Sequence, residues 1–231
     1  MTCAAYAEGL ERCCPMEQSQ PGYYSFRRAE MIARVPTSAR RILEIGCAAG
    51  AAMEELRKRQ PIQWAGGVEL VVEQAEKARA FFEQVWIENI ELTQIESDIP
   101  DKSIDAILCF DVLEHLINPW EVVKRLTPKL SMNGVLIICV PNIRNWKFIR
   151  DLLFKGEFIY RDSGLLDRTH LRFFVKETAT ELATCGGLQL TDISPANKFR
   201  PRFFKKMLSV LTGGRIDPLF IIQWAVVATR K

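Results

Sequence analysis

Short apolar runs alternate along this chain with stretches that have helical spacing. Apolar runs at 40–46, 62–70, 85–91, 104–110 and 133–142 predict strands, and the stretches at 50–60, 71–84 and 119–130 predict helices. Strands that are apolar without alternation are typical of a parallel sheet that is buried on both faces. The pattern therefore predicts an α/β fold, with a mostly parallel sheet and helices on both faces.

The strand–helix rhythm breaks after residue 141. Residues 142–174 carry aromatic and charged residues without strand spacing, and we expect a helical insertion, or lid, over one edge of the sheet. A helix at 176–187 and strands at 188–194 and 220–230 follow, which predicts an antiparallel C-terminal edge on a seven-stranded, Rossmann-like sheet. Residues 1–22 are expected to form a flexible lead-in, and residues 23–231 a single domain.

Composition narrows the class of protein. The 231 residues are 48% hydrophobic and 26% charged, and the net charge is +3, which gives no reason to expect nucleic-acid binding. We expect no secretory signal and no transmembrane helix. Seven cysteines without a C-x-x-C pair and only two histidines predict reduced thiols, a cytoplasmic protein and no metal site.

The stretch "RILEIGCAAG", residues 41–50, predicts a ligand-binding turn after the first strand. It lacks the glycines of a dinucleotide fingerprint and the Gly-Lys-Ser/Thr of a phosphate loop, and Glu44 would repel phosphate. Glu69 ends the second strand, where an acid commonly binds a ribose diol. A ligand with an ammonium group, a ribose and no phosphate fits S-adenosylmethionine. In the alternative interpretation, both acids simply end strands.

Four stretches resemble motifs of the class I S-adenosylmethionine-dependent methyltransferases: "LEIGCAAG", "GVEL", "ENIE" and "CFDVLEHL". Ala48 and Asn89 stand where this family usually has glycine and an acid. The resemblance implies that Glu69 binds the ribose, that Asn89 and the Ile90 backbone lie at the adenine, and that Asp111 and His115 lie near the methionine end. The implied cofactor contacts are Glu44, Gly46, Cys47, Ala48, Gly50, Glu69, Leu70, Asn89, Ile90, Asp111, Val112 and His115.

A later stretch, "DRTHLRFF", resembles a bacterial subgroup of these enzymes whose members are often fused to, or encoded near, glycosyltransferases. The resemblance implies O-methylation of a glycan, a glycolipid precursor or a related metabolite, with S-adenosylhomocysteine as the product. Two rival hypotheses remain: a methyltransferase for a small aromatic or quinone-like acceptor, and a non-catalytic module that binds the cofactor.

A hydroxyl acceptor needs a base, and three residues are candidates. His170 lies in the insertion, where it is either the base or a structural histidine. His115 either lines the cofactor pocket or acts in catalysis. Asp111 either orients or accepts a proton, or it caps a helix.

Other residues are assigned from their positions. Tyr24 and Arg28 are one helical turn apart; they either close over the cofactor, with Arg28 at its carboxylate, or lie on an exposed helix face. The candidate acceptor contacts are Asn142, Trp146, Asp167 and Arg168.

Residues 198–206, "KFRPRFFKK", mix five cations with three phenylalanines. They form either a solvated connector or a patch that makes peripheral contact with an anionic membrane.

Overall fold

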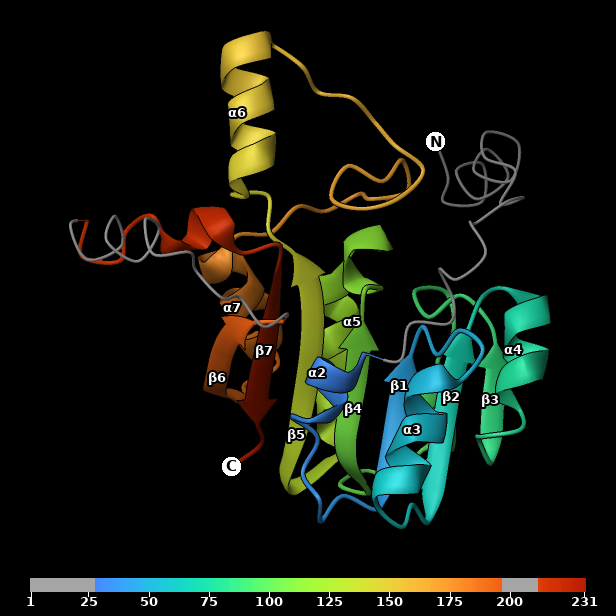
Figure 1. The fold of residues 1–231 in the computed structure, drawn as a ribbon. Coiled ribbons are helices and arrows are strands. Elements are labelled where there is room, and N and C mark those ends of the chain that lie inside the picture. Colours follow the sequence, from blue (N-terminus) through green and yellow to red (C-terminus); the bar gives the residue numbers. More distant parts are fainter. Residues whose placement is uncertain (1–27, 197–211) are drawn as a thin grey trace.

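The computed structural model describes residues 28–196 and 212–231 and contains a seven-stranded sheet (Figure 1). The strand order is β3-β2-β1-β4-β5-β7-β6, with β1 to β5 parallel and β7 antiparallel to both of its neighbours. The predicted fold class, including the antiparallel C-terminal edge, is confirmed. The strands are β1 (Arg41–Ile45), β2 (Trp64–Glu69), β3 (Gln84–Ile87), β4 (Ile104–Phe110), β5 (Leu130–Pro141), β6 (Gln189–Pro195) and β7 (Gln223–Thr229).

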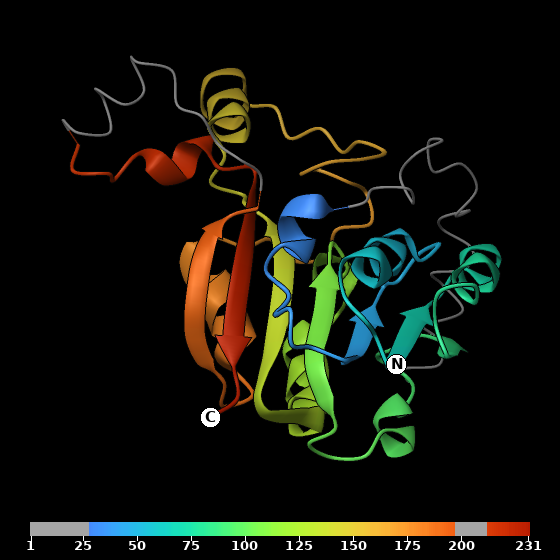
Figure 2. The same ribbon diagram turned by 60° about the horizontal axis from the view of Figure 1, so that its bottom comes forward.

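Helices cover both faces of the sheet, as the sequence predicts (Figures 1 and 2). Successive strand residues point to opposite faces, so Ile107 and Cys109 belong to one core cluster while Ala106 and Leu108 belong to the other. The helices α2 (Ala29–Ile32), α3 (Ala51–Arg59) and α4 (Val72–Ala78) pack on one face, and α5 (Pro119–Leu126) and α7 (Lys176–Thr184) on the other. Short 3-10 turns complete the connections: η2 (Ile95–Asp98), η3 (Leu113–His115), η4 (Thr127–Lys129) and η5 (Asp217–Phe220).

The insertion after β5 has two parts. Its first part is α6 (Trp146–Lys155), which stands above the edge of the sheet where β1 to β5 end (Figures 1 and 2). Its second part returns to that edge: Leu171 N and Arg172 N both donate to the Glu114 carbonyl, at 2.8 and 3.0 Å. A few residues later, Phe174 forms a parallel β-bridge with Asn142. The insertion is thus fastened at the carboxyl edge, and its lid function stays a prediction.

Some expectations fall outside what the structure describes or need correction. The lead-in at 1–22, Tyr24 and the basic segment at 198–206 lie outside the described residues. Among the described residues before Pro36, Ala29–Ile32 form a helix of four residues, α2. Cys109 and Cys139 are buried free thiols, as expected. Among the described helices, none is both long enough and apolar enough to cross a membrane.

Candidate functional site

The loop after β1 lies at the point where the strand order reverses, between β1 and β4. Gly46 and Gly50 have φ angles of +70° and +84°, which a side chain rarely tolerates. A Cβ at Gly46 would also lie 3.0 Å from the Val112 side chain, just past the end of β4. Gly46 N and Cys47 N donate to the Val68 carbonyl at 2.8 and 3.0 Å. The expected glycine turn is therefore a tight loop held between the ends of β1, β2 and β4.

Glu69 fastens this loop from the end of β2. One oxygen of its carboxylate accepts the Ala48 N–H at 2.9 Å, and the other accepts the Val71 N–H at 2.8 Å. A carboxylate has about four acceptor positions, so two remain for ligand hydroxyls. Ala48 has a φ of +46°, although its Cβ disfavours that region. The alanine thus adopts the backbone conformation that a glycine would adopt without strain.

Glu44 is a buried acid without a hydrogen-bond partner on one oxygen. It is 3% exposed, and its Oε2 is unpartnered among the described residues. Burial, and then the nearby Glu69 charge, raise the pKa of the Glu44 carboxyl to about 8. Such an oxygen is stabilised by a donor or a cation, so this acid fits a ligand that carries an ammonium group and no phosphate.

The segment after β3 holds the residues expected at the adenine. Asn89 Oδ1 accepts the Glu91 N–H at 2.9 Å, which makes a local turn. Ile90 is buried, and its carbonyl accepts a hydrogen bond from Arg125. Leu70, after β2, is 53% exposed. These positions agree with a base-binding edge, and the contacts themselves remain predictions.

Asp111 follows β4 and has a φ of +53°. It does not cap a helix, because η3 begins after Val112 and has no side-chain cap. Its carboxylate instead forms an ion pair with Arg28 and accepts the Gln223 amide. Arg28 also donates to Gln223 Oε1 at 3.2 Å. Arg28 is therefore brought to the carboxyl edge, where it contacts Asp111; its expected contact with the cofactor carboxylate stays a prediction.

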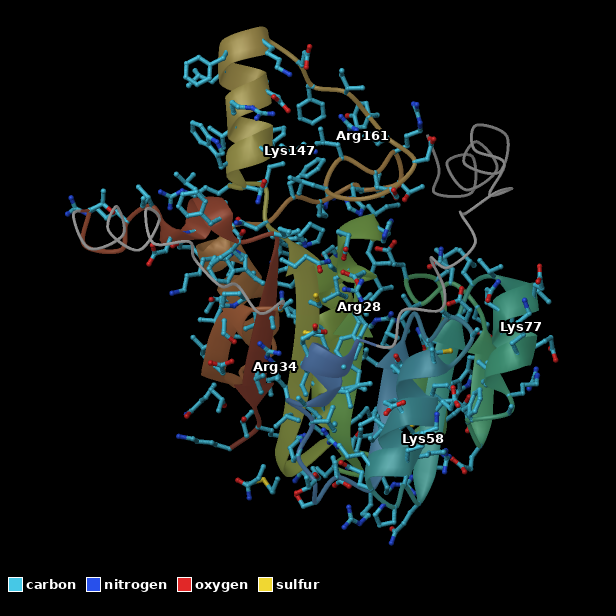
Figure 3. All side chains as sticks on the ribbon, viewed as in Figure 1. Arg28, Arg34, Lys58, Lys77, Lys147 and Arg161 are labelled. Carbon is cyan, nitrogen blue, oxygen red and sulfur yellow. The ribbon has the colours of Figure 1, made fainter. Side chains whose placement is uncertain are left out.

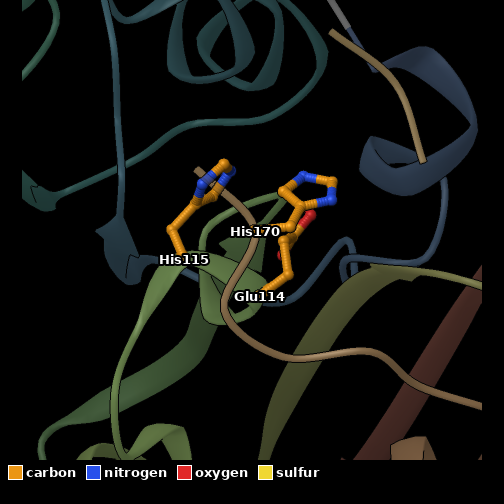
Figure 4. A group of neighbouring side chains, drawn as sticks. All are labelled: Glu114, His115 and His170. Carbon is orange, nitrogen blue, oxygen red and sulfur yellow. The ribbon is translucent and has the colours of Figure 1, made fainter. Parts of the chain in front are cut away.

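Glu114, His115 and His170 form one cluster at this edge (Figure 4). Their potential ligand atoms all lie within 4.8 Å of one another, and the two imidazole centroids are 4.7 Å apart. The 3-10 turn η3 supplies Glu114 and His115, and the returning part of the insertion supplies His170. The structure thus unites the two histidines that the sequence offered as separate candidates.

Hydrogen bonds define the tautomers of both histidines. His115 Nδ1 lies 2.9 Å from the Thr169 hydroxyl oxygen and 3.3 Å from the Thr169 carbonyl, and His170 Nδ1 lies 3.1 Å from the Leu165 carbonyl. The Thr169 hydroxyl donates its proton to Asp167, and a carbonyl only accepts, so each Nδ1 carries the proton and each Nε2 has the lone pair. Burial, and then the neighbouring His170, lower the pKa of His115 to about 4; burial also lowers the pKa of His170. Both rings are therefore neutral proton acceptors near pH 7.

Glu114 is the member of this cluster that sequence reasoning missed. It is 1% exposed, neither carboxylate oxygen has a partner among the described residues, and burial raises its pKa to about 8. The available signal was its place beside His115 in "LEH", directly after a buried strand. Two imidazoles and a carboxylate could also hold a metal ion, whereas sequence spacing gave no such indication. The expectation of no metal remains a prediction.

The expected acceptor contacts separate into different environments. Asn142 is fully buried, and its amide donates to the Pro218 and Ile221 carbonyls at 2.7 and 2.9 Å. These bonds fix the Asn142 side chain against the chain before β7, and its expected substrate contact stays a prediction. Asp167 is also buried and accepts the Thr169 hydroxyl at 2.7 Å, behind His115. Arg168 is exposed and pairs with Asp162, and Trp146 begins α6 at 42% exposure.

Comparisons with known proteins agree with this geometry. A family model described as a methyltransferase domain matches residues 9–193. A ubiquinone biosynthesis O-methyltransferase of Coxiella burnetii is 25% identical over 163 residues, covering 70% of this chain and 68% of the relative. Its counterpart from Bradyrhizobium diazoefficiens is 27% identical over 124 residues, covering 52% and 47%.

Solved structures share the fold at lower identity. A methyltransferase from Archaeoglobus fulgidus has a TM-score of 0.60 at 17% identity, covering 88% of this chain and 94% of its own. The cyclase SpnF has the same TM-score at 15% identity, covering 98% and 92%. Fold similarity at this level therefore includes a protein named for a different reaction, and the family match carries the assignment. The chain belongs to the methyltransferase domain family and is a class I, S-adenosylmethionine-dependent methyltransferase.

Proposed function

We propose that this enzyme methylates a hydroxyl oxygen on a small aromatic, quinol-like acceptor. The observation that carries the proposal is the pair of neutral histidines, His115 and His170, beside the unpartnered carboxyl of Glu114. The pair lies at the same sheet edge as the loop after β1. This position supports a role for the pair as the base for an acceptor hydroxyl that meets the methyl donor at this edge.

The loop after β1 and the two acids beside it suit the cofactor that the family uses. Glu69 has acceptor positions left for the ribose hydroxyls, Glu44 has an oxygen for the ammonium group, and the bare backbone at Gly46 permits close approach. When bound, the cofactor supplies a methyl group already activated by a sulfonium. The protein then has to align the acceptor oxygen and take its proton.

The strength of the base favours an aromatic acceptor. Imidazoles with lowered pKa values are weak bases. A phenolic hydroxyl, with a pKa of about 10, gives up its proton far more readily than a sugar alcohol. Proton transfer to Nε2 of His170 or His115 during methyl transfer is therefore more favourable for a phenol. The proton on each Nδ1 stays there and remains hydrogen-bonded to the backbone throughout.

Apolar side chains that suit a ring are exposed close in sequence to the cluster. Leu171 and Phe173, in the segment after His170, are 43% and 38% exposed, and Ile117, after η3, is 46% exposed; Arg172 lies between the first two and donates to the Ile117 carbonyl. The relatives' name, ubiquinone biosynthesis O-methyltransferase, supports the same class of acceptor. The glycan acceptor expected from the subgroup resemblance gains no support from the comparisons and stays the second hypothesis.

A substrate panel tests the proposal. The purified full chain is incubated with S-adenosylmethionine and either catechols and hydroquinones with and without an alkyl tail, or free sugars and sugar nucleotides. Mass spectrometry measures S-adenosylhomocysteine and the methylated product. We expect O-methylation of the phenolic compounds and none of the sugars. Turnover of sugars alone, or binding of the cofactor without turnover of any phenol, would refute the proposed acceptor class.

A further inference from the structure

Helix α6 presents an apolar face that the described residues leave largely exposed. None of its ten residues is buried, and it stands beyond the sheet edge in both views (Figures 1 and 2). Leu152 and Leu153 are 43% and 70% exposed. Apolar side chains gathered on one surface mark an interaction site more often than scattered ones do.

The face is amphipathic at helical spacing. At 100° per residue, one side of α6 carries Trp146, Phe148, Ile149, Leu152 and Leu153. The other side carries Lys147, Arg150, Asp151, Lys155 and one apolar residue, Phe154. A helix with Trp, Phe and Leu on one side and mainly cations on the other has the pattern of an interfacial helix.

The loop that follows extends this surface toward the site. Phe158 packs edge-on against Phe148 of α6 at 5.6 Å between ring centroids, and against Phe173 at 6.3 Å. Ile159 and Tyr160 remain 53% and 49% exposed. We call residues 146–160 the α6 surface. Through Phe173, which lies three residues after His170, this surface is continuous with the catalytic edge.

The charge of the surroundings indicates what covers the α6 surface. Residues 144–161 contain five cations and two acids, Asp151 and Glu157. Asp151 pairs with both Arg150 and Lys155, so the positive excess remains (Figure 3 labels Lys147 and Arg161 in this region). If a second copy of the chain packed on this face, the cations of the two copies would face and repel each other. An anionic bilayer instead complements the charge and accepts the apolar side chains.

We propose that the α6 surface binds the interface of an anionic lipid bilayer, with the catalytic edge turned toward the membrane. The inference is independent of the acceptor's identity. It is also separate from the expectation for residues 198–206, because it depends on described residues alone.

Vesicle binding tests the proposal with the full chain. Co-sedimentation is measured with vesicles of phosphatidylcholine and phosphatidylglycerol in equal parts, and with pure phosphatidylcholine. We expect binding to the anionic vesicles that weakens with salt. The double variant Leu152→Glu/Leu153→Glu should reduce partitioning at least tenfold, because two apolar contacts become charges in an anionic interface. Lys147→Glu should reduce it about 25-fold, at about fivefold per unit of charge.

Matched controls carry the same chemical change elsewhere. Leu92→Glu alters a side chain that is 72% exposed, and Lys77→Glu alters a cation on α4, far from Lys147 (Figure 3). Both controls should bind vesicles as well as the unmodified chain. Absence of binding by the unmodified chain, or equal losses in variants and controls, would overturn the proposal. So would a light-scattering dimer that the double variant converts to a monomer, because a second copy would then cover the face.

Tryptophan fluorescence gives a readout that needs no destabilising variant. Of the five tryptophans, all described, Trp146 alone is exposed. Lipids brominated on the acyl chain should quench the fluorescence of the unmodified chain, and Trp146→Phe should remove that quenching. Equal quenching in Trp146→Phe, or no quenching in the unmodified chain, would place the α6 surface outside the membrane.

Discussion

Replacing Glu114 by glutamine should remove one source of pH-dependent stability. The carboxyl is 1% exposed and its oxygens have no partner among the described residues, so folding favours its protonated form. Its pKa rises from an ordinary 4.5 to about 8. Glutamine has nearly the same shape as the protonated acid and does not titrate.

The sign and size of the effect follow from linkage. Between pH 4.5 and 8 the folded chain holds a proton that the unfolded chain has released, so raising the pH lowers the free energy of unfolding. Each pH unit within this interval contributes about 1.36 kcal/mol, less near the folded pKa. From pH 5.5 to 7.5, Glu114 should therefore remove about 2.5 kcal/mol of stability that Glu114→Gln retains.

Urea unfolding at pH 5.5, 6.5 and 7.5, followed by fluorescence and by circular dichroism, measures the difference. Glu44, which also has a raised pKa, is present in both chains, so its contribution cancels in the comparison. Glu88→Gln, at an exposed position, controls for the lost charge and should follow the unmodified chain. If the curves for Glu114→Gln and the unmodified chain ran parallel with pH, the buried carboxyl would not titrate as described.

Three further predictions concern the cofactor loop and the base. Glu69→Gln should weaken binding of S-adenosylmethionine about 10- to 100-fold in calorimetry, because a charged acceptor for the ribose is lost. Ala48→Gly should raise the free energy of unfolding in urea by about 1 kcal/mol, since glycine adopts the φ of +46° without strain. His170→Ala should lower kcat about 10²- to 10⁴-fold and leave cofactor affinity within about twofold, because only proton removal is affected.

Control variants accompany these three predictions, and each control is expected to have no effect or the opposite effect. Glu73→Gln, an exposed change on α4, should leave cofactor affinity unchanged; equal affinity in Glu69→Gln would exclude the ribose contact. Ala52→Gly, within α3, should lower stability by about 1 kcal/mol, and a loss in Ala48→Gly as well would contradict the strain at the loop. Full turnover by His170→Ala would leave His115 as the base.

The positions of the main elements could be predicted because their signals are local. Apolar runs such as 104–110 identify a strand from its own residues, and the helix at 176–187 begins and ends within about three residues of α7. The glycine loop could be predicted equally well, because Gly46 and Gly50 directly follow an apolar strand. Ala48 departs from the family pattern, yet its backbone keeps the left-handed conformation.

Other features depend on which residues meet in space. Nothing near Glu114 in the sequence indicates that His170, 56 positions later, lies beside it. Asn142 lies at the expected end of β5, but the chain before β7 covers it completely. The apolar spacing of α6 would ordinarily indicate a buried helix face, and only its place above the sheet shows that most of this face is exposed.

The sequence by itself determined the order of strands and helices, the glycine turn after β1 and the acids around that turn. These features depend on hydrophobic periodicity and on the backbone freedom of glycine, which are properties of residues close together in the chain. The tertiary structure alone decided the union of Glu114, His115 and His170, the burial of Asn142 and the exposure of α6. Those outcomes depend on how segments that are distant in the sequence pack together. Burial shifts a pKa or removes a side chain from solvent, and it arises only when those segments have packed.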